Sequence, residues 1–228
     1  MEAYIRMLNK QKHSRAIKTK SLGQAIAEEL RKRIWKGEFK LGERLLEAKL
    51  SKEMEISRSS LREALQILEY EGLVVNKVRR GTFVAQFTEK DIQEINELRL
   101  HIEVPAMMKT AKVIEESQIN ELELIIQEMK QCIDIEDWFG LFEADMDFHI
   151  YLIQLCGNSR IIRLYSIIQN QIRTVLSQLV NYYENRKHEF YEEHEELLRA
   201  IRTKNPVEVQ NVALSHINHI YYQITNTP

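Results

Sequence analysis

The stretch from residue 56 to residue 83 constrains the fold of this 228-residue chain more than any other. Apolar residues recur within it at helical spacing, which predicts a helix with one buried face: Leu61, Ala64, Leu65, Ile67 and Leu68. Ser57 can cap the start of this helix, and Ser60 with Glu63 has the spacing of a second capping box. Gly72 is expected to end the helix.

A basic hairpin is expected after this helix. Residues 73–75 and 82–85 have the composition of strands, and Arg79-Arg80-Gly81 forms a tight turn between them. Three upstream segments have the patterns of an amphipathic helix, a turn and a short second helix: residues 21–35, 41–46 and 47–54. Elements in this order predict a winged helix-turn-helix, whose last helix presents hydroxyls and arginines at its start to phosphates and base edges.

Four motifs in this region resemble the GntR family of bacterial transcription regulators: Gly42-Glu43-Arg44, Ser57-Arg58-Ser59-Ser60-Leu61-Arg62-Glu63-Ala64-Leu65, Leu68-Glu69-Tyr70-Glu71-Gly72-Leu73-Val74 and Arg80-Gly81-Thr82-Phe83-Val84. The resemblance implies a set of DNA-contacting residues: Arg44, Ser57, Arg58, Ser59, Ser60, Arg62, Arg80 and Gly81. Arg58 and Arg62 would read the base sequence, and Arg80 with Gly81 would place the wing in the minor groove. A plain three-helix scaffold with solvated arginines is the alternative, but the wing and both helices occur in the correct order.

The charge distribution favours two parts with different partners. Residues 1–86 carry 19 Lys and Arg against 11 Asp and Glu, a net charge of +8, whereas residues 87–228 carry 13 against 23, a net charge of −10. The basic part suits the phosphates of double-stranded DNA, and the acidic part should point away from them. Most charged residues among residues 1–20 are lysines and arginines, and this segment is expected to form a flexible basic tail.

A cytoplasmic protein is expected. The two cysteines, Cys132 and Cys156, have neither the number of a disulfide framework nor the spacing of a metal motif. The first residues lack the apolar run of a signal peptide, and no stretch approaches transmembrane length. We therefore expect no membrane partner.

From residue 88 onward the pattern is helical throughout. The whole chain has only three prolines and seven glycines, and six helices are predicted here: residues 89–113, 117–133, 136–156, 158–183, 186–203 and 206–225. Pro105 is expected to kink the first of them. Helices of this length with short links form an antiparallel bundle, whose interior can hold a ligand or a metal.

The fold class that follows is mainly α. A winged helix-turn-helix is expected over residues 21–87, after the tail of residues 1–20. An antiparallel all-helical bundle of about six helices is expected over residues 88–228.

Four polar residues within the predicted bundle have the chemistry of a metal site. Asp145 and His149 lie four residues apart on one helix face, and His194 and His216 belong to two further helices. One carboxylate and three imidazoles complete a first shell for a divalent transition metal, with room for a water or a ligand oxygen. Spacing alone is weak evidence, because a histidine in a helix is more often a packed or surface residue.

The same region is similar to the FCD effector domain of FadR-like GntR regulators. The resemblance is carried by Asp145-x-x-x-His149, Gly157-Asn158, His194 followed by Leu-Leu-x-Ala-Ile, and His216. In the metal-binding members of that group, the aspartate and three histidines at these positions ligate one metal. The resemblance therefore implies a divalent metal here: imidazoles fit zinc or nickel, and the carboxylate keeps manganese possible.

Two residues compete for places in this set. Asp147 is close to Asp145 in the sequence but points to a different helix face from His149. His219 lies one turn from His216 and is an alternative to it. Both are expected to lie outside the first coordination shell.

Arg99 and Asn158 are candidates for contact with a small effector. Arg99 and Glu103 lie four residues apart, and their simplest role is an intrahelical ion pair, worth ~0.3–0.5 kcal/mol if exposed. The family places an arginine near its effector cavity, where its planar cation can bind a carboxylate. Asn158 either caps a helix or contacts the effector.

A transcription regulator, rather than an enzyme, is the function that these features predict. A homodimer would bind a pseudo-palindromic operator, because one monomer reads too few base pairs for genomic specificity. Repression is expected, since a bound dimer blocks polymerase, and an organic acid on the metal would control binding. A helical metalloenzyme is an alternative, although the four ligands have no evident general acid or base beside them. A metal that only staples the bundle is another.

Overall fold

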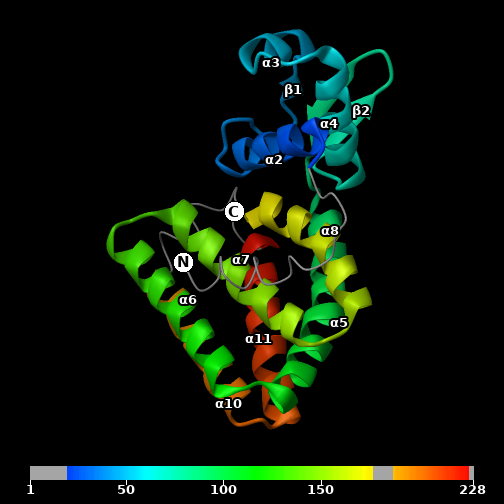
Figure 1. Ribbon diagram of the computed structural model, residues 1–228. Coiled ribbons are helices and arrows are strands. Elements are labelled where there is room, and N and C mark those ends of the chain that lie inside the picture. Colours follow the sequence, from blue (N-terminus) through cyan, green and yellow to red (C-terminus); the bar gives the residue numbers. More distant parts are fainter. Residues whose placement is uncertain (1–19, 177–186, 226–228) are drawn as a thin grey trace.

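The computed structural model describes residues 20–176 and 187–225, which form a winged-helix unit above a helical bundle (Figure 1). The described chain is mainly helical with one small N-terminal sheet, which confirms the predicted fold class. The tail expected over residues 1–20 lies, apart from Lys20, outside the described residues.

The winged-helix unit packs its helices against a small antiparallel sheet with the strand order β1-β3-β2. Its elements are α2 (Leu22–Trp35), β1 (Arg44–Leu45), α3 (Glu47–Glu53), α4 (Arg58–Tyr70), β2 (Val74–Lys77) and β3 (Gly81–Val84). Helix α2 lies across α4, and both contribute fully buried leucines to a shared core, Leu30 from α2 and Leu61 from α4. This core holds α4 with its polar face outward.

Local hydrogen bonds fix both ends of α4. At its start, Ser57 Oγ accepts a hydrogen bond from the backbone N–H of Ser60 at 3.1 Å, as an N-cap does. At its end, Gly72 has a φ of 76°, and the N–H of Leu73 donates to the carbonyl of Leu68 at 2.9 Å. This is a Schellman motif, which needs a residue that tolerates positive φ.

Two local predictions for this unit were wrong. Residues 41–46 do not form only a turn, because Arg44 and Leu45 pair with Phe83 and Thr82 of β3. A two-residue strand whose partner lies far along the chain has no local signature. The hairpin strands also lie at 74–77 and 81–84 rather than 73–75 and 82–85.

The second capping box was wrong as well. Ser60 lies inside α4, and Glu63 accepts a hydrogen bond from Ser21 Oγ at 2.9 Å. Ser21 caps α2, so this contact joins the starts of the two helices. A Cβ on Gly23 would lie 2.4 Å from the Glu63 carboxyl carbon, so the absence of a side chain there allows the close approach.

The bundle consists, within the described residues, of α5 (Glu89–Val113), α6 (Glu116–Asp134), α7 (Trp138–Leu155), α8 (Ser159–Leu176), α10 (Lys187–Arg202) and α11 (Pro206–Thr225). Their bounds agree closely with the predicted helices, although the end expected for 158–183 lies partly outside the described residues. Helix α5 continues through Pro105. No helix in the described ranges is both long and apolar enough to cross a membrane.

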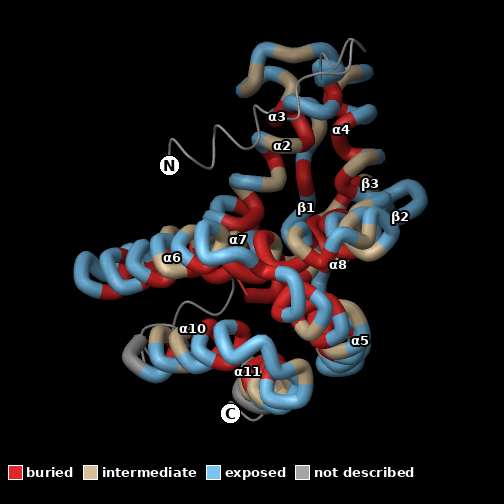
Figure 2. Tube along the Cα trace, turned by 60° about the horizontal axis from the view of Figure 1, so that its bottom comes forward, coloured by how far each residue is buried: buried red, intermediate tan, exposed pale blue. Residues whose placement is uncertain are grey.

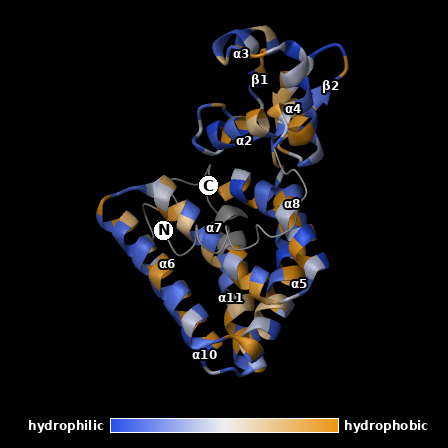
Figure 3. Ribbon diagram, viewed as in Figure 1, coloured by the Kyte–Doolittle hydropathy of each residue, from blue (hydrophilic) through white to orange (hydrophobic). Residues whose placement is uncertain are grey.

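Helix α7 is central to the bundle. It contacts α5, α6 and α8, and buried residues run along most of its length (Figure 2). The outer helices α6 and α10 are amphipathic, and Figure 3 shows hydrophilic and hydrophobic residues interspersed along α6. Polar side chains on the inner face of α7 therefore lie away from solvent, between three or more helices.

Candidate metal centre

The four residues predicted to bind metal lie together in the interior of the bundle. Helix α7 contributes Asp145 and His149, α10 contributes His194 and α11 contributes His216. All four side chains are buried, and one potential ligand atom from each lies within 4.8 Å of the others. Three helices that are distant in sequence therefore converge on one point.

The distances within this cluster fit a single small cation. His194 Nε2 lies 2.9 Å from Asp145 Oδ1, and His149 Nε2 lies 3.1 Å from His216 Nε2 and 3.6 Å from Asp145 Oδ1. Metal–ligand bonds of roughly 2.0–2.2 Å place neighbouring ligand atoms ~3–4 Å apart. The observed separations lie close to that range.

A hydrogen bond on the far side of the His194 ring directs a lone pair into the cluster. His194 Nδ1 donates to the backbone carbonyl of Phe190 at 2.8 Å, which leaves Nε2 of a neutral ring as an acceptor. That lone pair then faces the Asp145 carboxylate, an arrangement that a cation between them stabilises. Asp145 Oδ2 is also buried without a hydrogen-bond partner among the described residues. The donor set thus fits a divalent metal.

Glu103 is a part of the site that sequence reasoning missed. Its Oε1 accepts hydrogen bonds from Arg99 Nε at 2.7 Å and from the Tyr165 hydroxyl at 3.1 Å. Its Oε2 lies 2.7 Å from His149 Nδ1, the distance of an ion pair but without the angles of a hydrogen bond. A carboxylate beside Nδ1 can orient the ring so that Nε2 faces the other candidate ligands. The Arg99 and Glu103 spacing was visible in the sequence, but the link to His149 depends on how α5 packs on α7.

The Arg99–Glu103 pair is buried, not exposed. The two residues are 4 % and 0 % exposed, so the small free energy of a surface ion pair does not apply to them. Burial alone would raise the pKa of Glu103, but Arg99 and His149 hold this pKa well below its usual range. Glu103 is therefore ionised and compensates the buried guanidinium.

The electrostatics of the cluster suit metal ligands. Burial would raise the pKa of Asp145, but the His194 contact and the surrounding imidazoles lower it overall. Burial lowers the pKa of His216 to about 4. The carboxylate is thus ionised and the His216 ring unprotonated near neutral pH, as coordination requires.

The competing residues lie in other contacts. Asp147 pairs with Arg173, with Oδ1 and Nη2 3.3 Å apart. His219 contacts Glu193 through Nδ1. Asn158 Oδ1 accepts hydrogen bonds from the backbone N–H groups of Arg160 and Ile161 at the start of α8, as a helix cap does. Its contact with an effector stays a prediction.

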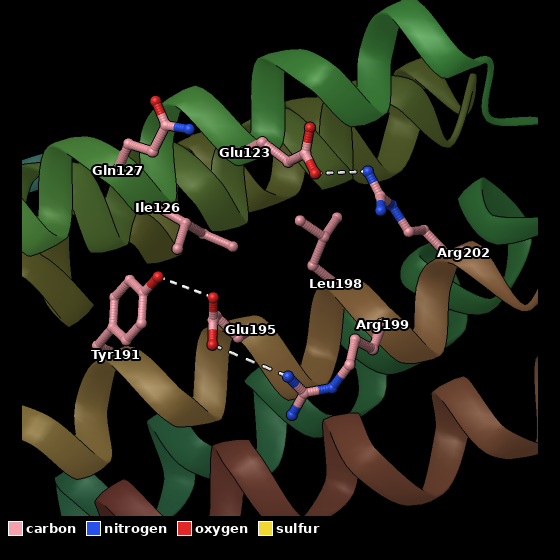
Figure 4. Close-up of a pocket in the computed structure, with 8 residues that line it drawn as sticks. All are labelled: Glu123, Ile126, Gln127, Tyr191, Glu195, Leu198, Arg199 and Arg202. Carbon is pink, nitrogen blue, oxygen red and sulfur yellow. Dashed lines mark hydrogen bonds and ion pairs between the residues drawn. The ribbon is translucent and has the colours of Figure 1, made fainter.

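A surface groove on the other side of α10 is distinct from the cluster. It has a volume of about 380 Å³ and is lined by residues of α6 and α10 (Figure 4). Glu123 pairs there with Arg202 at 2.5 Å, and the Tyr191 hydroxyl donates to Glu195 at 2.7 Å. The charged and polar groups of these side chains are paired with one another. Among the residues that line the groove, no cluster of potential metal ligands is found.

Most of the residues predicted to contact DNA have exposed side chains. Arg44, Ser57, Arg58, Ser59, Arg62 and Arg80 are exposed, whereas Ser60 and Gly81 are partly buried. Arg62 Nε of α4 donates to Glu47 of α3 at 2.8 Å, so this ion pair holds the Arg62 side chain against α3. At the wing, the Arg44 guanidinium lies 3.4 Å from where a Cβ on Gly81 would be. Gly81 has a φ of 96°, a conformation in which a side chain would be strained.

Comparison with known proteins agrees with both units. Residues 22–84 match bacterial regulatory proteins of the gntR family, and residues 94–219 match the FCD domain. The gluconate operon transcriptional repressor of Bacillus subtilis is 31 % identical over 81 % of this chain and 77 % of its own length. The HTH-type transcriptional regulator YdhC of the same organism is 29 % identical over 84 % and 85 %.

A solved structure extends the agreement to the fold. A GntR transcriptional regulator from Rhodococcus sp. RHA1 has a TM-score of 0.81 and 26 % identity, covering 91 % of this chain and 99 % of its own. These proteins are transcription regulators rather than enzymes. The chain belongs to the GntR family of bacterial transcription regulators, with an FCD domain after its winged helix-turn-helix.

Proposed function

We propose that this protein is a cytoplasmic transcriptional repressor whose affinity for its operator is controlled at a metal centre in the FCD domain. The observation that carries the proposal is the convergence of Asp145, His149, His194 and His216 in the bundle of a chain that also has a DNA-binding unit. The boundary between the two functions would lie near residue 88, with residues 1–20 as a separate tail.

The four residues would hold zinc, nickel or manganese. A bound metal would supply an open coordination position at which an effector carboxylate replaces water. Arg99 donates to Glu103, which lies beside His149 of the cluster, and Arg99 would bind the second oxygen of the effector carboxylate. Asn158 would be a second effector contact. The name of the gluconate operon repressor supports repression and suggests gluconate as a first organic acid to test.

DNA binding would use two copies of the chain. A single winged helix covers one half-site, and a homodimer on a pseudo-palindromic operator doubles the sequence that is read. The acidic bundle would connect the copies, because it is repelled by DNA and lies away from the basic units. Sedimentation of the full chain tests this assembly, and a monomer at micromolar concentration contradicts it.

The His194→Ala variant tests the metal centre. It removes one ligand, so we expect a loss of bound metal and a lower melting temperature for protein purified in the presence of zinc. His101→Ala is the matched control, because His101 lies on the exposed side of α5. Metal content by mass spectrometry and thermal unfolding measure both effects.

Two results are informative against the proposal. If His194→Ala retains a full equivalent of metal and an unchanged melting temperature, the four residues are not a metal centre. If it loses the metal but its operator binding responds to gluconate or other organic acids as in the wild type, the metal only stabilises the fold of the bundle.

A further inference from the structure

Helix α7 has a second polar cluster on the face opposite the metal ligands. Glu143 and Asp147 alternate along α7 with Asp145 and His149, and both contact the guanidinium of Arg173 on α8. Arg173 Nη1 lies 2.5 Å from Glu143 Oε1, and Nη2 lies 3.3 Å from Asp147 Oδ1. One helix therefore bears both the metal ligands and the carboxylates that hold Arg173.

Arg173 lies against the winged-helix unit. Its side chain is buried, and its guanidinium carbon lies 4.9 Å from the centre of the Trp35 ring and 6.0 Å from that of Phe142. Trp35 is the last residue of α2, and its Nε1 donates to the hydroxyl of Thr174 at 3.1 Å. A cation over a buried indole is a favourable and directional contact. Two successive residues of α8 thus hold the end of α2.

Helix α8 also touches the end of α4. Gln171 Nε2 donates to the backbone carbonyl of Glu71, the C-cap of α4, at 3.2 Å. Glu71 is in turn held by Arg31 of α2 through two contacts of 2.9 and 2.7 Å. A Cβ on Gly72 would lie 2.3 Å from Gln171 Nε2. Helix α8 therefore contacts the ends of both α2 and α4, which together set the orientation of α4.

The opposite part of α8 reaches the surroundings of the metal centre. Tyr165 is buried and donates to Glu103, the carboxylate that contacts His149. Movements of α7 or of Glu103 on metal or effector binding would thus act on α8 at two points. Among these residues of α8, Arg173 contacts both α7, through Glu143, and the winged-helix unit, through Trp35.

We propose that Arg173 is the positioning residue that couples the metal centre to the DNA-binding unit, by tying α7 to Trp35. This inference rests on the proposed function, since it assigns the route by which that site changes operator affinity. The contact needs both the charge and the planar shape of arginine. A neutral side chain of similar length should leave both binding sites intact but weaken their coupling.

The test compares Arg173→Met with the wild type in a Trp138→Phe background. The chain has two tryptophans, so Trp35 is then the only one and reports on its own surroundings by fluorescence. Zinc affinity is measured by calorimetry, and the DNA probe is a duplex selected from a random pool by the wild-type protein. Arg163→Met is the matched control, because Arg163 is exposed on the same helix.

In the wild type and in Arg163→Met, zinc should change the duplex Kd by about 5–150-fold, the usual range of coupling between sites, and should shift the Trp35 emission. In Arg173→Met, the zinc Kd should stay within about twofold of the wild type. The ratio of duplex Kd values with and without zinc should fall towards one, and the emission shift should disappear.

A wild-type ratio in Arg173→Met with intact zinc binding overturns the inference and leaves the proposed function standing. The proposed function is overturned instead if the wild-type protein does not bind zinc, or if zinc does not change its affinity for the duplex. If Arg173→Met does not fold, Glu143→Gln replaces it, because Glu143 is partly exposed and contributes one of the two ion pairs. An unchanged ratio in that variant again overturns the inference.

Discussion

At the scale of single residues, Glu103 determines how the buried charges of the site balance. It compensates Arg99, accepts from Tyr165 and contacts His149, so three groups depend on one carboxylate. Removing the charge leaves a buried guanidinium without its counterion, which is costly in a protein interior. It also removes the group that orients His149 towards the other ligands.

Glu103→Gln should therefore weaken zinc binding by about 10–100-fold, the usual effect of losing a group that orients a metal ligand. It should also lower the free energy of unfolding of the metal-free protein. Calorimetric titration with zinc and urea unfolding measure the two effects. Glu97→Gln, an exposed glutamate on the same helix, should change neither; equal zinc affinities for Glu103→Gln and the wild type contradict this role.

The four residues of the buried cluster could be predicted from the sequence, but their surroundings could not. Asp145 and His149 are linked by helical spacing, and His194 and His216 follow from the resemblance to FCD domains. Glu103 lies 46 positions before His149, on a helix whose rotation about its axis depends on packing. Asn158 differs, because its role as a helix cap was one of two alternatives that the sequence offered, and its hydrogen bonds at the start of α8 agree with it.

At the scale of elements, α4 combines a fixed orientation with an exposed polar face. Its two ends are held by the Ser57 cap and the Gly72 motif, and its apolar stripe is buried. Local patterns were sufficient to predict this helix, because its signals lie within a few residues of its ends. They were insufficient for β1, whose two residues become a strand only by pairing with β3.

Arg58 and Arg44 should differ in how they affect DNA binding. If Arg58 reads a base from the start of α4, as predicted, Arg58→Ala should lose ~1–3 kcal/mol of discrimination between the selected duplex and a scrambled one. Arg44→Ala removes a phosphate contact and should weaken binding to both duplexes alike. Fluorescence anisotropy at fixed physiological salt measures both. Unchanged discrimination by Arg58→Ala shows that α4 is docked differently.

At the scale of the whole molecule, a basic winged-helix unit is joined to an acidic FCD domain by a small set of contacts. The net charges of +8 and −10 on residues 1–86 and 87–228 orient the molecule on a polyanion. The contacts of Trp35, Arg173 and Gln171 fix the two parts relative to each other. Helices α7 and α8 then offer a route by which a change at the buried cluster can reach the DNA-binding unit.

The most direct test of metal-controlled DNA binding is the affinity of the chelator-treated full chain for the selected duplex, titrated with zinc at constant ionic strength. We predict that one equivalent of zinc per protomer changes the duplex Kd by at least about fivefold, and that His194→Ala shows no such change. A duplex Kd that is the same with and without zinc in the wild type, while zinc binds stoichiometrically, would contradict control of the operator by this centre.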